Sequence, residues 1–144
     1  VHKLGMGNYI VFTGAALHAE VANYIAIADL FVSLYDLSNV GNPLLEAMSS
    51  GKCVLTLNNG GTSSIVSHNV NGFLLEMDEI DKIATAVVSL LNDNSWRNRL
   101  GMAAKEYARQ NFWTWSQRMD REISEVERIC IDWDYRCSGS KSGH

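Results

Sequence analysis

Four short apolar runs, bounded by glycine, asparagine or aspartate, predict the β-strands of this chain. The first run, residues 9–14, is nearly continuous in strand-forming residues and closes at Gly14, a pattern typical of a strand buried on both faces. The other three strands are expected at residues 30–34, 52–57 and 72–76.

Helical spacing fills the segments between these runs. Residues 18–28 place Val21, Tyr24, Ile25 and Ala28 on one face of a predicted helix. Further helices are expected at residues 43–50, 63–67, 79–92, 95–111 and 117–131. Alternating strands and helices predict an α/β fold with a Rossmann-like, mainly parallel sheet, flanking helices, right-handed crossovers and a helical C-terminus.

The turn between the second strand and the next helix carries the strongest local signal. Asn42 is a favoured N-cap residue, Pro43 suits the first helical position, and Gly41 relieves steric limits on the turn. A capped helix start of this kind points several backbone N–H groups outward. The turn therefore predicts an anion site, with a phosphate or diphosphate as the usual ligand.

Glu46 is expected in the first turn of that helix, where two interpretations stay open. Its carboxylate can accept two hydrogen bonds from a vicinal diol such as a ribose. Alternatively, Glu46 only stabilises the positive end of the helix dipole, an effect of ~0.3–1 kcal/mol. The segment alone does not favour either interpretation.

Three glycine-bearing turns follow predicted strands, at Gly14, at residues 38–42 and at residues 58–61. The carboxyl ends of parallel strands meet at one edge of a sheet, and ligands bind there. The three turns together therefore predict a binding site at that edge.

Composition narrows the classes of partner. A net charge of −4 argues against a nucleic-acid surface. Three widely spaced cysteines indicate a reducing, cytoplasmic compartment and have no metal-ligand spacing. No apolar run reaches the ~18–20 residues that span a bilayer. Four tryptophans could stack on sugars, but their place among the C-terminal helices favours packing.

The stretch Gly41-Asn42-Pro43-Leu44-Leu45-Glu46-Ala47-Met48-Ser49-Ser50-Gly51 resembles the donor-site signature of the family 4 retaining glycosyltransferases, which have the GT-B fold. That signature has two glutamates eight positions apart. The second corresponds to Glu46, and Ser38 stands where the family has the first. Phe12-Thr13-Gly14, Asn59-Gly60-Gly61-Thr62 and Leu100-Gly101 also resemble family segments, in the family's order.

The resemblance implies a role for each matching residue. Glu46 would bind the ribose, and Gly14 and Ala16 would frame the base. The donor sugar and diphosphate would be held by Ser38, Asn39, Val40, Gly41, Asn42, Pro43 and Leu44. No catalytic residue is assigned, because a serine at position 38 cannot supply the family's carboxylate. The resemblance implies no cofactor and no metal.

The resemblance also implies a partial GT-B C-terminal domain over residues 1–137. Residues 138–144 are rich in glycine and serine, so this tail is expected to be disordered or an expression remnant. The family's two earlier strands, its Arg/Lys diphosphate clamp and its N-terminal acceptor domain have no counterpart in this sequence. Without those strands, residues 9–14 would expose an apolar edge, which favours self-association of the isolated chain. The full-length protein would be cytoplasmic, with a peripheral place at the inner membrane face by family analogy.

The resulting hypothesis is the donor-binding part of a glycosyltransferase of hexosyltransferase type. It would transfer a sugar from a nucleotide-diphosphate sugar to a glycan or lipid acceptor with retention, as in polysaccharide biosynthesis. The isolated fragment would be inactive. The alternatives are a non-catalytic module for nucleotide-sugar binding or assembly, and a GT-B nucleotide-sugar epimerase.

Overall fold

The computed structural model describes residues 2–35 and 40–139, which fall into two compact units. The first unit, Val1–Gln110, carries the β-sheet. The second unit, Asn111–His144, contains the long helix α5 (Trp115–Gly139).

The sheet has three parallel strands in the order β1 (Phe31–Ser33), β2 (Val54–Leu57) and β3 (Phe73–Leu75). Phe31 lies opposite Val54, and Leu55 lies opposite Phe73. All four residues of β2 are buried, as expected for the central strand of a parallel sheet that is covered on both faces. The predicted parallel α/β fold is confirmed.

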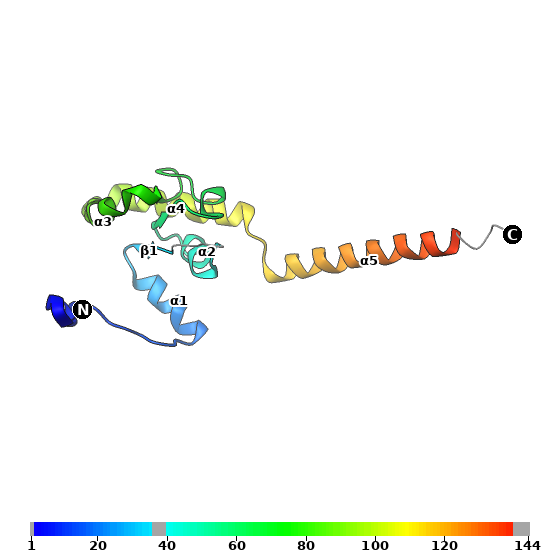
Figure 1. Cartoon of the computed structure of the whole chain (residues 1–144), viewed down its shortest axis with the longest axis horizontal. Coiled ribbons are helices and arrows are strands. Elements are labelled where there is room, and N and C mark those ends of the chain that lie inside the picture. Colours follow the sequence, from blue (N-terminus) through cyan, green and yellow to red (C-terminus); the bar gives the residue numbers. More distant parts are fainter. Residues whose placement is uncertain (1, 36–39, 140–144) are drawn as a thin grey trace. The chain divides into compact units, whose positions relative to one another are not determined.

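Helices cover both faces of the sheet (Figure 1). On one side lie α1 (His18–Ile27) and α2 (Asn42–Ser49), and on the other lie α3 (Ile83–Asn92) and α4 (Asn94–Asn111). The main apolar core includes Leu55 and Leu57 of β2, Leu90 of α3 and Leu100 of α4. Because side chains alternate along a strand, Leu55 and Leu57 share the face that packs against α3 and α4.

The predicted strand at residues 9–14 is wrong. A short 3-10 helix, η2 (Gly7–Tyr9), begins that segment, and residues 10–14 form no strand. The side chains of Tyr9, Val11 and Phe12 are 81%, 85% and 79% exposed. A strand is stable only when a neighbour completes its hydrogen-bond ladder, and none of the strand pairings in the described residues joins this segment to β1. Closure of residues 9–14 against residues 30–34 within the chain therefore does not occur.

Several predicted helices differ in extent. The short helix expected at residues 63–67 is a single 3-10 turn, η3 (Thr62–Ser64). The helix expected at residues 79–92 is divided into a 3-10 segment, η4 (Met77–Lys82), and α3, and η4 itself is kinked at Glu79, whose backbone is not helical. A further 3-10 turn, η1 (His2–Leu4), precedes η2. The last helix is longer than predicted, and residues 140–144 of the predicted tail lie outside the described residues.

Candidate functional site

The helix α2 begins one residue earlier than the sequence predicts. Gly41, not Asn42, is its N-cap, with an extended backbone at φ −79° and ψ 146°. The Gly41 carbonyl accepts the N–H of Leu44 at 3.0 Å, which closes the first turn. Asn42 and Pro43 are therefore the first two helical residues. The N–H of Asn42 has no partner within the helix, and Pro43 has no N–H to donate. The positive end of α2 lies at Gly41 and Asn42.

The shifted start also moves Glu46 relative to the helix. Glu46 is the fifth residue of α2, and the first turn contains no acidic side chain, so the prediction of a first-turn position is wrong. The side chain is half-buried, and no hydrogen bond or ion pair to another described residue holds its carboxylate. Because dipole effects fall off within the first turn, this position favours the diol-binding interpretation over the dipole interpretation.

The loops that follow β1 and β2 meet at the carboxyl edge of the sheet. The side-chain amide of Asn59 donates a hydrogen bond to the carbonyl oxygen of Tyr35. Gly61 lies against Val40, since a Cβ atom added to Gly61 would come within 3.3 Å of Val40 Cγ2. Two of the three predicted turns are thus side by side. Ser38 and Asn39, which the sequence also assigns to this site, lie outside the described residues.

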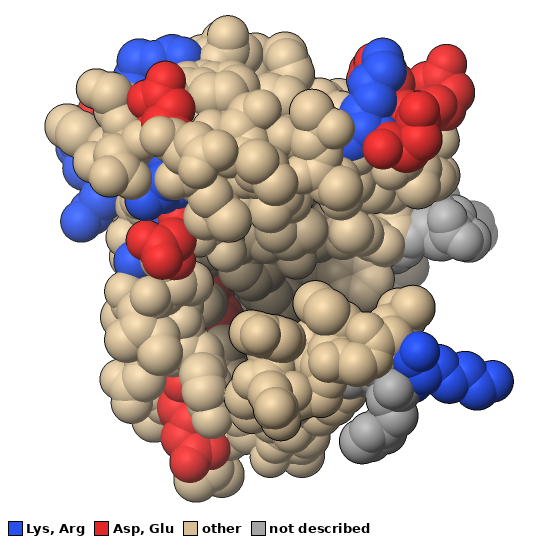
Figure 2. Space-filling view, turned by 90° about the vertical axis from the view of Figure 1, so that its left-hand side faces the viewer, with Lys and Arg blue, Asp and Glu red and all other residues tan. Residues whose placement is uncertain are grey.

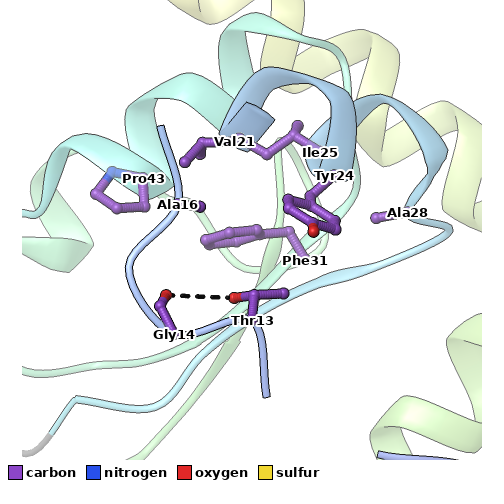
Figure 3. Close-up of a pocket in the computed structure, with 9 residues that line it drawn as sticks. All are labelled: Thr13, Gly14, Ala16, Val21, Tyr24, Ile25, Ala28, Phe31 and Pro43. Atoms are coloured by element: carbon purple, nitrogen blue, oxygen red, sulfur yellow. Dashed lines mark hydrogen bonds between the residues drawn. The ribbon is translucent and has the colours of Figure 1, made fainter. Parts of the chain in front are cut away.

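The third predicted turn shares a cavity with the start of α2 (Figure 3). Gly14, Ala16 and Pro43 are among its lining residues, and its volume is about 450 Å³. The backbone of Gly14 is in the left-handed region at φ +64°, which favours glycine, and lets the chain turn here. The residues predicted to frame a base and one residue predicted to bind diphosphate therefore line one cavity.

Aromatic and aliphatic side chains that the sequence assigned to the core form the rest of this cavity. Tyr24 of α1 is 49% exposed, and Phe31 of β1 is half-buried. The full lining is Thr13, Gly14, Ala16, Val21, Tyr24, Ile25, Ala28, Phe31 and Pro43. Helical spacing identified the apolar face of α1, but it could not show that part of this face borders open space.

The predicted donor residues of α2 do not all face this cavity. Leu44 is 3% exposed and belongs to the core, and its backbone N–H already donates to the Gly41 carbonyl. Val40, Gly41, Asn42 and Glu46 are not among the residues that line the cavity. Any ligand that contacts both Ala16 and Glu46 must therefore extend from the cavity along the start of α2.

The cavity is electrically neutral. None of its nine lining residues is charged. Lys52 is the lysine or arginine closest in sequence to the turn at residues 38–42, and its ammonium group donates to the carbonyl oxygen of Ala26 at 2.6 Å. Figure 2 shows a face of the molecule that is hollowed in its middle and carries its charged side chains mostly around the periphery. Phosphate binding here would depend on backbone N–H groups.

The sequence predicts neither a metal site nor a membrane-spanning helix, and the described residues can be searched for both. No group of three or more His, Cys, Asp or Glu side chains gathers there in a way that could hold a metal ion. Metal independence stays a prediction. No helix among the described residues is long and apolar enough to cross a bilayer.

In open α/β sheets ligands bind at the carboxyl ends of the strands, where the loops after β1 and β2 meet in this chain. The chain belongs to the glycosyl transferases group 1 family, whose model matches residues 1–107. This family and its GT-B fold confirm the resemblance seen in the sequence.

Individual relatives agree with this assignment. The chain is 30% identical over 121 residues to a GDP-mannose-dependent α-(1-6)-phosphatidylinositol monomannoside mannosyltransferase of Mycobacterium tuberculosis, covering 79% of this chain and 31% of the relative. It is 27% identical over 132 residues to N-acetyl-α-D-glucosaminyl L-malate synthase of Bacillus anthracis, covering 92% and 33%. The chain thus spans about a third of the length of these curated relatives.

Among solved structures, Anabaena HepE in complex with UDP and glucose superposes with a TM-score of 0.78 at 26% identity, covering 89% of this chain and 34% of HepE. Sucrose-phosphate synthase of Thermosynechococcus elongatus superposes with a TM-score of 0.79 at 23% identity, covering 91% and 32%, which supports the fold alone.

Proposed function

We propose that this chain is the donor-binding part of a hexosyltransferase that transfers a sugar from a nucleotide-diphosphate sugar to a glycan or lipid acceptor. The observation that carries the proposal is the meeting of the loops after β1 and β2 next to the start of α2, which shares a cavity with Gly14 and Ala16. The relatives support it, since one is named as GDP-mannose-dependent and HepE has been solved with UDP-glucose.

Each part of a nucleotide sugar has a counterpart in this arrangement. The base enters the cavity at Gly14 and Ala16, where the rings of Tyr24 and Phe31 offer apolar surface to a flat heterocycle. The ribose diol donates to the carboxylate of Glu46, which is half-buried and forms no hydrogen bond or ion pair with another described residue. The base and ribose positions thereby fix the direction of the donor along α2.

The diphosphate lies at the start of α2 in this proposal. The backbone N–H groups of Val40, Gly41 and Asn42 bind its oxygens, and the helix dipole favours their negative charge. The same groups stabilise the charge that develops on the leaving diphosphate, so that no basic side chain is required for departure. Pro43 and Leu44 donate no hydrogen bond to the diphosphate, and their role is to fix the start of α2 beside it. No metal is invoked in the proposal.

Ser38 is the proposed contact to the transferred sugar. Its hydroxyl can donate or accept a hydrogen bond, but it cannot stabilise positive charge at the reacting carbon as a carboxylate does. Retention of configuration, which the family resemblance implies, would then depend on the diphosphate and on groups outside this chain.

A non-catalytic nucleotide-sugar module is the second candidate. Two observations favour it: serine occupies position 38, and none of the residues that line the cavity is Lys or Arg. Such a module would bind the donor through the same cavity and helix start, without turnover.

Ser38→Glu, made in the intact protein that contains this chain, distinguishes the candidates. We expect this substitution to change the transfer rate or the choice among UDP- and GDP-hexoses, measured as kcat/KM for each donor. Ser95→Glu, at the start of α4, is the matched control and should leave both unchanged. Equal kinetics for Ser38→Glu and the unsubstituted protein would place residue 38 outside the donor site, and no transfer by either would favour the non-catalytic module.

A further inference from the structure

A second cavity, of about 420 Å³, lies along β3, the strand at the opposite edge of the sheet from β1. It is bounded by β3, by η4 and α3, and by the start of α4, and it shares no lining residue with the cavity at Gly14. Its volume lies within the range of small-molecule sites. Neither the family assignment nor the proposed donor site gives it a role.

Three rings form one wall of this cavity. The Phe73 ring lies 4.6 Å from the His68 ring at 61° and 5.6 Å from the Trp96 ring at 75°, measured between centroids. The indole N–H of Trp96 donates to Asn69 Oδ1 at 2.7 Å, which fixes the orientation of that ring. Trp96 also packs against the apolar core, so its predicted packing role is confirmed. The rings offer rigid apolar surface to a ligand without further ordering.

His68 adds a polar ring to this wall. Its Nδ1 lies 2.6 Å from the Leu74 carbonyl oxygen and 3.3 Å from the Leu74 backbone nitrogen, so the backbone of β3 occupies this ring nitrogen in either tautomer. Nε2 is hydrogen-bonded to no described residue, and it can donate to or accept from a ligand hydroxyl according to the tautomer.

The opposite wall carries hydroxyl groups and one ion pair. Thr85 and Ser89 lie one helical turn apart on α3, both are exposed, and neither hydroxyl is hydrogen-bonded to another described residue. Glu79 and Lys82 pair at 2.7 Å between carboxylate oxygen and ammonium nitrogen. The pair neutralises the charge of both groups, so the cavity attracts neither an anion nor a cation strongly.

We propose that this cavity binds a neutral pyranose sugar, separately from the donor. A pyranose presents apolar C–H faces that match the three rings, and hydroxyl groups that match His68 Nε2, the Glu79 carboxylate, Thr85 and Ser89. A phosphorylated ligand would find no uncompensated cation here. The inference concerns a different set of residues from the proposed function and stands without it.

The test is a titration of the isotope-labelled chain with methyl α-D-mannopyranoside and, separately, with methyl α-D-glucopyranoside, followed by NMR. We expect saturable shifts of the Trp96 indole N–H and of the Thr85 and Ser89 amides, with a dissociation constant of about 1 mM for at least one sugar. Thr85→Ala/Ser89→Ala should weaken binding by about tenfold, because two modest hydrogen bonds are lost. The changed residues are exposed, so the variant keeps its fold.

Val88→Ala is the matched control, since Val88 is exposed on α3 and does not line the cavity; its affinity should be unchanged. The proposal is overturned if neither sugar produces saturable shifts, or if the double variant binds as tightly as the unsubstituted chain. It is also overturned if uridine shifts these signals and the sugars do not. A parallel UDP titration, read at the Gly14 and Ala16 amides, reports on the proposed donor site, so the two proposals can fail independently.

Discussion

Replacing Glu46 with alanine should weaken nucleotide binding and leave the fold almost unchanged. Glu46 lies in the second turn of α2, and its removal breaks no hydrogen bond or ion pair between described side chains. The dipole effect of ~0.3–1 kcal/mol applies to the first turn, and alanine is the better helix former. We therefore expect a change below ~0.5 kcal/mol in the free energy of unfolding.

The binding effect is larger. Two hydrogen bonds from a ribose diol to a carboxylate contribute ~1.5–3 kcal/mol each when the groups are well buried. Glu46 is only half-buried, which lowers the expected total for both bonds to ~1.5–3 kcal/mol, or about 10- to 100-fold in affinity. Glu46→Gln retains one acceptor oxygen and should show an intermediate loss.

Ligand-observed NMR on the chain measures this prediction, with UDP and GDP as ligands and thermal unfolding as the check on stability. Glu127→Ala, the same change on the exposed surface of α5, is the control and should bind normally. A 2′,3′-dideoxynucleoside diphosphate lacks the diol and should bind the unsubstituted chain and Glu46→Ala equally. The reasoning fails if Glu46→Ala lowers the melting temperature but not the nucleotide affinity. It also fails if Glu46→Ala weakens binding of the dideoxy analogue as much as it weakens binding of UDP or GDP.

Two further experiments test the packing of the first unit. Gly101→Ala should lower the free energy of unfolding by about 1–3 kcal/mol, because the added Cβ would lie 2.3 Å from the carbonyl oxygen of Gly51. Chemical denaturation measures this change, and Met102→Ala, at an exposed neighbouring position, is the control that should change the free energy little. Burial raises the pKa of the Cys53 thiol to about 11, although Arg97 opposes the rise, so less of the reactive thiolate exists at any lower pH. At pH 8 a thiol reagent should label exposed Cys130 quickly and Cys53 only after unfolding; equal labelling rates in the folded chain would contradict the buried position of Cys53.

The sequence predicted the parallel sheet well because the strands β1, β2 and β3 are bounded by strong local signals. Apolar runs end at turn-forming residues, and a helix with proline in its first turn follows β1. The same reading failed at residues 9–14, where the composition is as strand-like as that of β2. Strand formation there depends on a neighbouring strand that completes the hydrogen-bond ladder, and composition carries no information about whether such a strand is present.

The candidate site was predicted in its parts but not in its detail. Gly41 and Asn42 are both acceptable N-cap residues, so residue type alone does not decide between them, and the extended backbone of Gly41 makes it the cap. This shift of one residue decided where Glu46 falls relative to the helix dipole. Likewise, Tyr24 and Phe31 were recognisable as apolar, but their position beside open space depends on the path of residues 13–16.

Amide NMR of the labelled chain with UDP and GDP tests the central claim most directly. The account predicts shifts confined to the proposed contacts and their immediate neighbours, the contacts being Gly14, Ala16, Tyr24, Phe31, Val40, Gly41, Asn42 and Glu46. Because the residues that line the cavity supply no cation, and charge-assisted bonds to a cationic pair would contribute about 10²–10⁴-fold, binding should be about millimolar. Shifts that map elsewhere on the chain, no saturable shifts, or micromolar affinity would contradict it.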